Sequence, residues 1–433
     1  MINKYKTNIL TAAALFLVFL AVSCVSGGNS SAGERLGAPV TITVDTDRHQ
    51  YVRGFGGMSN AWSSPVITEN DITTMYGEDG LGYNIFRIMI YPDRERWSAN
   101  VTAARKAKSY GALILASPWT PPPELKSNKS HISGRLPRSS FASYAAHLRS
   151  FVDFMAQNGV KIDVISFQNE PDINVSYDSC DWPSADMMDF VINYGREIGD
   201  VLIIPGEPYQ FSRAYYSPML SSSEAVDKFD IVGGHIYGSG LSPYQLAAEK
   251  GKEVWMTEHL LNTQSDYYFD STWPAAMTMA KEIHDCMSAG FNAYIWWYLK
   301  RFYGMIGDDQ YDTDAGQVLF RGYVMSHYAK YAIGKYRVGA QRNGNTLVYV
   351  TAYESENDLC VVIINMDIGS SDALITLPDQ FARVSAVETD GKGSAQDGAI
   401  GAMREKSVTL GEGGKTAELR LASRSIVSLR IER

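Results

Sequence analysis

Eight short apolar runs recur between residues 54 and 298, and this recurrence constrains the fold more than any other feature of the sequence. The runs are continuous rather than alternating, which is typical of strands buried on both faces by helices. Helical spacing of apolar residues separates several of them, as in 141–157, where Gly159 follows. We therefore predict an α/β fold, a (β/α)8 TIM barrel, with a doubly wound sheet as the alternative. The runs are 54–58, 83–90, 112–118, 163–169, 201–207, 230–237, 253–258 and 293–298.

The pattern changes after about residue 335, where strand-like runs alternate with turns rich in Gly, Asn, Asp and Ser. These runs predict an all-β sandwich. The segment 38–45 is also strand-like and precedes the first barrel strand, so we expect it to join the same sandwich. The expected domains are an N-terminal sandwich strand (38–50), the barrel (51–334) and the C-terminal β-sandwich (335–433).

The first 37 residues predict export. Residues 1–23 form a signal peptide, in which Lys4 and Lys6 precede an apolar run of about 14 residues that is too short for an ordinary membrane span. Cys24 follows at the position that a bacterial lipoprotein signal lipidates, although Ala21 replaces the usual Leu. We expect residues 24–37 to carry this lipidation site and a flexible tether. The protein is then either lipid-anchored at the bacterial cell envelope or secreted.

The composition excludes several functions. With 39 basic and 48 acidic side chains, the net charge of −9 argues against nucleic acid as a partner. The four cysteines lack metal-ligand spacing, so we expect no metal site and no cofactor. The 26 Tyr and 8 Trp residues favour a surface that stacks on weakly polar ligands such as sugars.

Two acidic residues lie where the apolar runs stop. In a TIM barrel the active site lies at the C-terminal ends of the strands. Glu170 follows the fourth run and Glu258 closes the seventh, so two carboxylic acids should reach the same barrel mouth. A glycosidase needs this pair, one acid to protonate the leaving oxygen and one carboxylate on the other side of the sugar ring.

Five motifs make the family resemblance specific. The sequences R-G-F-G-G-M (53–58), A-S-P-W-T-P-P (116–122), Q-N-E-P-D (168–172), W-M-T-E (255–258) and W-W-Y-L-K-R-F-Y-G (296–304) resemble bacterial glucuronoxylanases of glycoside hydrolase family 30. The resemblance extends from about residue 38 to the C-terminus. It implies a retaining endo-β-1,4-xylanase that hydrolyses glucuronoxylan, with a barrel and a β-sandwich made from both chain ends.

The same resemblance implies roles for individual residues. Glu170 would be the general acid/base and Glu258 the nucleophile, while Arg87 would hold the nucleophile in an ion pair. The expected substrate-binding residues are Asn169, Trp62, Trp119, His235, Tyr237, Thr263, Trp297, Arg301 and Tyr303.

Recognition of a (4-O-methyl)glucuronic acid branch is implied by Arg301 and Tyr303, with Trp297 before them. A guanidinium offers paired donors and permanent charge to a uronate carboxylate. Thr263 keeps a hydroxyl that the subfamily uses, but Leu260 stands where the subfamily commonly has Tyr. Loss of that contact costs about 1.5 to 3 kcal/mol and would weaken branch dependence by about ten- to a hundredfold.

Two other functions stay open. One is a family-30 enzyme with weak branch dependence or activity on another β-glycoside. The other, of a different class, is a non-catalytic glycan-binding lipoprotein of the cell surface. We expect a monomer whose partner is a polysaccharide and whose membrane contact is limited to a lipid anchor at Cys24.

Overall fold

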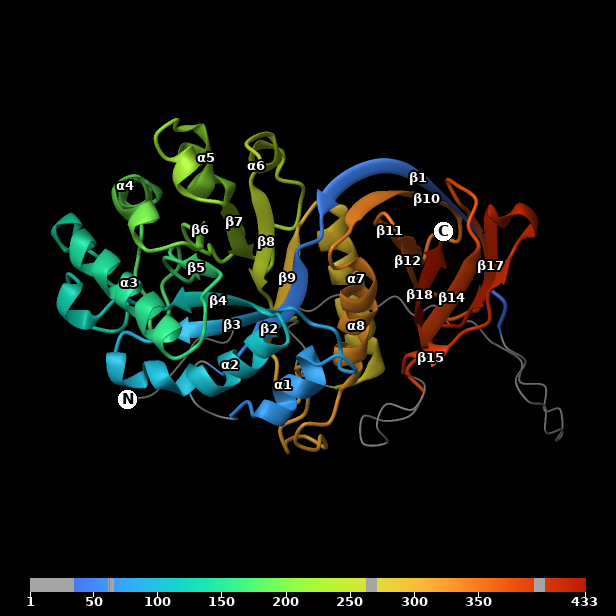
Figure 1. Ribbon diagram of the computed structural model, residues 1–433, viewed down its shortest axis with the longest axis horizontal. Helices are drawn as coiled ribbons and strands as arrows, with labels where there is room; N and C mark the ends of the chain where they lie inside the picture. The colour runs from blue at the N-terminus through green and yellow to red at the C-terminus, as the bar shows by residue number, and fades with distance from the viewer. Residues whose placement is uncertain (1–34, 61, 63–65, 262–270, 393–401) are drawn as a thin grey trace, which may run out of the picture. The chain divides into compact units, whose positions relative to one another are not determined.

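The computed structural model describes residues 35–60, 62, 66–261, 271–392 and 402–433 (Figure 1). All eight apolar runs form parallel strands of one sheet, in the spatial order β6-β5-β4-β3-β2-β9-β8-β7. The sheet curves into the predicted TIM barrel. Its strands are β2 (Gly54–Met58), β3 (Ile85–Ile90), β4 (Leu113–Pro118), β5 (Val164–Ser166), β6 (Leu202–Ile204), β7 (Ile231–His235), β8 (Glu253–Glu258) and β9 (Ala293–Tyr298).

Asp230 joins the two end strands of this sheet. Its backbone N–H donates to the Ile203 carbonyl over 3.1 Å, and its Oδ2 accepts from the Ile203 N–H over 2.9 Å. These bonds connect β6 to β7 near the N-terminal ends of the strands. At the opposite ends, His235 N–H donates to the Pro208 carbonyl over 2.9 Å, so the two strands are also linked next to the candidate site.

Helices cover the outside of the barrel. The predicted helix in 141–157 is present, buries Tyr144, Leu148 and Phe151, and is followed by Gly159, whose φ of 77° suits glycine. The α-helices in the described residues are α1 (Glu69–Tyr76), α2 (Val101–Ser109), α3 (Phe141–Gln157), α4 (Ser184–Tyr194), α5 (Arg213–Ser221), α6 (Gln245–Glu249), α7 (Trp273–Ser288) and α8 (Phe320–Ala332). No helix in this part of the chain is long and apolar enough to cross a membrane.

The side domain is one ten-stranded sheet, in the order β15-β14-β18-β12-β11-β10-β1-β13-β17-β16. Its two halves face each other across a shared apolar core, which gives the sandwich expected from the sequence. The strands are β1 (Val40–Tyr51), β10 (Tyr336–Gly344), β11 (Val348–Glu354), β12 (Asp358–Asn365), β13 (Ser371–Thr376), β14 (Arg383–Thr389), β15 (Arg404–Glu405), β16 (Thr409–Leu410), β17 (Thr416–Leu421) and β18 (Ser425–Glu432).

Both chain ends contribute to this sheet, as predicted. Strand β1 pairs with β10 in antiparallel and with β13 in parallel orientation. The sheet packs on α7 and α8, where buried His327 of α8 bonds to the hydroxyls of Ser428 and Thr389, each over 2.8 Å. The side domain therefore packs firmly against the helices next to β9.

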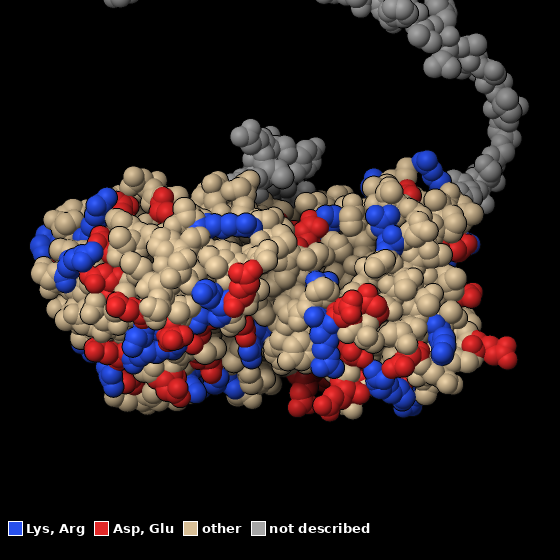
Figure 2. Space-filling view, turned by 90° about the horizontal axis from the view of Figure 1, so that it is seen from above, with Lys and Arg blue, Asp and Glu red and all other residues tan. Residues whose placement is uncertain are grey.

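Charged residues of both signs share the surface. Figure 2 shows acidic and basic side chains interspersed over the upper face of the molecule in Figure 1. On the described part of this face, neither sign of charge forms a continuous patch.

Candidate active site

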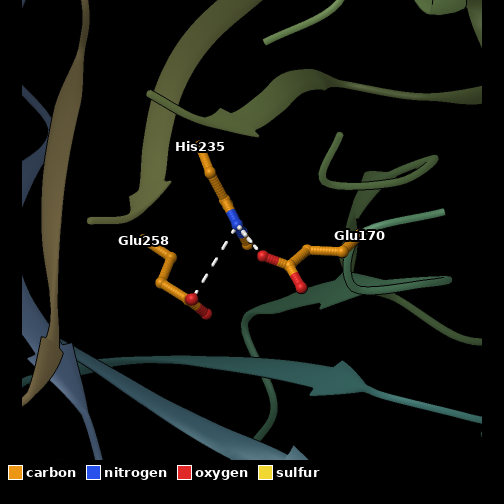
Figure 3. A group of neighbouring side chains, drawn as sticks. All are labelled: Glu170, His235 and Glu258. Carbon is orange, nitrogen blue, oxygen red and sulfur yellow. Dashed lines mark hydrogen bonds and ion pairs between the residues drawn. The ribbon is translucent and has the colours of Figure 1, made fainter. Parts of the chain in front are cut away.

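Glu170 and Glu258 lie together at the C-terminal ends of the barrel strands, as predicted (Figure 3). Glu258 is the last residue of β8, whereas Glu170 follows β5 by four residues, and both side chains are buried. One carboxylate oxygen of each lies within 4.8 Å of the other. His235, the last residue of β7, lies against both carboxylates.

The backbone holds Glu170 in an uncommon conformation. Its φ is +46°, which costs a residue with a side chain about 1 to 2 kcal/mol. Asn169 N–H donates to the Pro118 carbonyl over 2.8 Å, and Glu170 N–H donates to the Glu207 carbonyl over 2.9 Å. These bonds to the ends of the neighbouring strands fix the turn and point Glu170 toward the barrel axis.

Arg87 in β3 connects most of the site. Its side chain is 0% exposed, so its charge depends on protein partners. Nη1 donates to Glu258 Oε2 over 2.5 Å, and Nη2 donates to Asn169 Oδ1 over 2.7 Å and lies 3.0 Å from Glu207 Oε2. Because Asn169 Oδ1 accepts this bond from Arg87, the Nδ2 amide group of Asn169 is the donor at the other side of its side chain.

His235 is held by three carboxylates. Its Nδ1 lies 3.2 Å from Glu170 Oε1 and 3.8 Å from Glu258 Oε1, and its Nε2 lies 3.8 Å from Glu207 Oε2. Burial alone would lower the pKa of His235, but these carboxylates outweigh burial and raise it to about 9. The imidazole is therefore protonated at neutral pH. We expected His235 to bind substrate, but its complete burial limits it to acting through the carboxylates.

The two other buried acids of the site have opposite pKa shifts. Burial raises the pKa of Glu258 above its usual value, although His235 and Arg87 oppose this effect. Burial acts in the same direction on Glu207, but Arg87 and His235 outweigh it and lower the pKa of Glu207 to about 2. Glu207 therefore remains ionised, and Glu258 gains a proton more readily than an exposed glutamate.

Two tyrosines donate to the paired carboxylates. Tyr177 Oη donates to Glu170 Oε2 over 2.5 Å, and Tyr237 Oη donates to Glu258 Oε1 over 3.1 Å. Burial and the nearby carboxylates raise the pKa of both phenols, so both remain neutral donors. Tyr237 was expected at the site, whereas Tyr177 lies in a loop that gave no sequence signal.

Three tryptophans form one aromatic cluster beside the carboxylates. The ring centroids of Trp62, Trp119 and Trp297 lie 5.9 to 6.2 Å apart. Trp119 is buried beneath the Arg87 guanidinium, which lies 4.8 Å from its ring centroid. Trp62 is 39% exposed, so it presents aromatic surface to solvent.

Arg301 and Tyr303 lie after β9, at the same barrel end. Arg301 Nη1 is 3.4 Å from the Oδ2 of the fully buried Asp308 carboxylate, and its guanidinium lies 5.7 Å from the Tyr298 ring centroid. The neighbouring Lys300 makes a buried ion pair with Asp71 over 2.7 Å. Thr263 lies outside the described residues.

The donor set at the centre suits proton transfer better than metal binding. Glu170, His235 and Glu258 each offer one atom that could bind a metal ion, and these three atoms lie within 4.8 Å of one another. However, the raised pKa keeps a proton on His235, and Arg87 already occupies Glu258 Oε2. A cation placed there would meet two positive charges.

Comparison with known proteins identifies the relatives of this chain. No protein-family model matches it. It is 35% identical over 368 residues to the glucuronoxylanase XynC of Bacillus subtilis, an alignment that covers 82% of this chain and 84% of that protein. The xylanase Xyn30A of Clostridium acetobutylicum, from glycoside hydrolase family 30 subfamily 8, superposes with a TM-score of 0.80 at 30% identity over 91% of this chain and 100% of the other. A family 30 endoxylanase of Clostridium papyrosolvens C71 gives a TM-score of 0.78 at 30% identity, with the same coverage.

Proposed function

The chain belongs to glycoside hydrolase family 30, and we propose that it is a retaining endo-β-1,4-xylanase that cleaves glucuronoxylan at positions set by a (4-O-methyl)glucuronic acid branch. The observation that carries the proposal is the short separation of Glu170 and Glu258, whose nearest oxygens are within 4.8 Å. Retaining glycosidases place their two carboxyl groups about 5 to 5.5 Å apart, whereas inverting enzymes leave room for a water molecule at about 6.5 to 9.5 Å.

In the first step, Glu258 attacks the anomeric carbon as a carboxylate. A bond forms between a Glu258 oxygen and that carbon, the glycosidic bond breaks, and the leaving oxygen takes the proton of Glu170. Arg87 supports this assignment because its 2.5 Å contact favours the ionised form of Glu258 and so opposes burial, which raises the pKa of Glu258. It also orients one Glu258 oxygen, so the other oxygen, near Tyr237, is the candidate for attack.

In the second step, Glu170 acts as a base. It takes a proton from water, the water oxygen bonds to the anomeric carbon, and the ester to Glu258 breaks. Protonated His235 and Tyr177 each contact one Glu170 oxygen, so they stabilise the carboxylate that the first step leaves behind. The amide of Asn169, oriented by Arg87, is the candidate donor to the sugar 2-hydroxyl.

Sugar binding is assigned to the aromatic cluster. Trp62 offers an exposed ring for stacking on an apolar sugar face, and Trp297 and Tyr237 extend this surface toward the carboxylates. Trp119 is packed beneath Arg87, so we assign it to the floor of the site.

Recognition of the uronate branch is assigned to Arg301 and Tyr303, with Trp297 beside them. The Arg301 side chain is 26% exposed, so its fork remains reachable despite the ion pair with Asp308. Leu260 offers no hydrogen bond, and branch dependence therefore relies on Arg301 more than in a site that keeps a tyrosine there.

We also propose that the chain is exported and lipidated at Cys24, and acts as a monomer. The support is the basic start, the apolar run and the position of the cysteine, all of which lie outside the described residues. Mass spectrometry of the protein purified from membranes tests this proposal. A diacylglyceryl group on Cys24 is expected, and an unmodified mature N-terminus would contradict it.

The function is tested on glucuronoxylan and on an unbranched xylan with the chain from residue 25 onward. We expect products that each carry one uronate at a fixed distance from the reducing end. Proton NMR should show the β-anomer of the new reducing ends before the α-anomer. Glu258→Gln should abolish activity, whereas Glu253→Gln, at the other end of β8 and paired with Arg53, should keep it. Initial α-anomer or cleavage of neither xylan would overturn the proposal.

A further inference from the structure

Glu207 is a third carboxylate of the site, and the reaction steps above do not use it. It follows β6 in the chain, and its side chain is 0% exposed behind Glu170 and Glu258. It therefore cannot touch a substrate. Burying a carboxylate in such a place costs free energy unless nearby cations compensate its charge.

The backbone of Glu207 continues the pairing of two very short strands. Strands β5 and β6 pair only over Val164–Ser166 and Leu202–Ile204. Glu207 N–H then donates to the Gln168 carbonyl over 2.9 Å, and the Glu207 carbonyl accepts the Glu170 N–H over 2.9 Å. Glu207 thus directly supports the left-handed turn that presents Glu170.

The side chain of Glu207 contacts the two cations of the site. Its Oε2 lies 3.0 Å from Arg87 Nη2 and 3.8 Å from His235 Nε2. Arg87 in turn contacts Glu258. His235 contacts both Glu170 and Glu258, as Figure 3 shows. Each cation therefore lies between Glu207 and at least one catalytic carboxylate.

We propose that Glu207 is a positioning residue of the reaction, which holds Arg87 and His235 against the nucleophile and the acid/base. With Glu207 ionised, the two negative charges of Glu207 and Glu258 face the two cations before the reaction, and His235 keeps both of its ring protons. One ring N–H then points to Glu170 and the other to Glu207. This inference rests on the roles proposed above for Glu170 and Glu258.

Glu207→Gln tests the inference, because it keeps the shape and removes the charge. We expect kcat to fall about ten- to a hundredfold with little change in KM, since Glu207 does not reach the substrate. Protonated His235 stabilises the Glu170 carboxylate that the first step forms, so the rate of that step depends on the His235 proton as well as on that of Glu170. We therefore expect the basic limb of the profile of kcat/KM against pH to move down by about one to two units in Glu207→Gln, because His235 loses one of its opposite charges. Glu207→Asp should restore most of this limb.

The pH profile is informative because the other charges near His235 stay in place. These are Glu170 and Glu258 on one side, Arg87 across the site, and Asp172 in the loop after Glu170. The matched control is Asp230→Asn, which also removes a carboxylate bonded to an arginine and to β6, but at the other barrel end. It should lower stability and leave the pH profile unchanged.

A folded Glu207→Gln protein with wild-type kcat and basic limb would overturn the inference. If that variant does not fold, ring nitrogen NMR of His235 in the wild-type protein decides: protonation through pH 8 is expected, and a neutral ring at pH 7 would contradict it. Failure of the proposed function is distinguishable, because the wild-type chain would then cleave neither xylan or would release the α-anomer first.

Discussion

Replacing Arg301 with lysine separates branch recognition from catalysis. Lysine keeps the positive charge that the buried Asp308 needs, but it loses the two-pronged donor. A hydrogen bond to a charged group contributes about 1.5 to 3 kcal/mol. The Arg301 side chain is 26% exposed and already shared with Asp308, so we expect the lower half of this range. A loss of about 1.5 to 2 kcal/mol corresponds to a fall of about 10- to 30-fold in kcat/KM on glucuronoxylan.

The assay compares kcat/KM on glucuronoxylan and on unbranched xylo-oligosaccharides for the wild-type chain and Arg301→Lys. Only the value for glucuronoxylan should fall. The control is Arg342→Lys in β10, an arginine bonded to the backbone oxygens of Gly344 and Asn345, which should change neither value. Equal losses on both substrates would mean that Arg301 maintains the fold of the site, and no loss on glucuronoxylan would remove it from branch recognition.

The other predictions concern the carboxylates and the junction between domains. Glu258→Gln should lower kcat at least about a thousandfold. Glu170→Ala should recover activity on an aryl glycoside with a good leaving group when azide is added, and a Glu170 variant that azide does not rescue would count against the role of Glu170 as base. Asp308→Asn should lower the KM for glucuronoxylan a few-fold, because a buried negative charge no longer repels the uronate; a rise in KM would show that Asp308 mainly orients Arg301. Burial lowers the pKa of His327 to about 3, so the unfolded chain, with a histidine pKa near 6.5, binds the extra proton first as the pH falls. His327 therefore supports stability above pH 6.5, and the wild-type protein should lose about 2 kcal/mol of unfolding free energy between pH 6.5 and pH 5. Urea titrations should show this loss in the wild-type protein and not in His327→Gln.

The apolar runs predicted the barrel because continuous burial and strand position coincide in this fold. The run 253–258 matches strand β8 residue for residue, whereas 201–207 contains a strand of only three residues. Burial continues past the point where hydrogen-bonded pairing stops, so an apolar run overestimates such a strand. Strand β10 shows the opposite case: no apolar run marks it, because its residues are mostly polar and only partly buried, although it pairs with β1 and β11.

The strand-end rule found Glu170 and Glu258 because it depends only on where apolar runs stop. Glu207 ends the run 201–207 and satisfies the same rule, so the sequence did contain a signal for it. Tyr177 had none, since its contact with Glu170 depends on the path of a loop. The contact between Arg301 and Asp308 likewise depends on how the chain turns after β9.

The charges around the proposed uronate subsite bear on how a branch would be selected. The protein carries a net charge of −9, and the positive charge of Arg301 is largely balanced by Asp308. Little net positive field remains to attract a uronate from a distance, and salt screens what remains beyond about 10 Å. Selection must then come from short-range bonds to the guanidinium fork, formed only when the branch is already seated. On the proposed function, a single guanidinium fork would set the cleavage position on this acidic protein through its geometry more than through its charge.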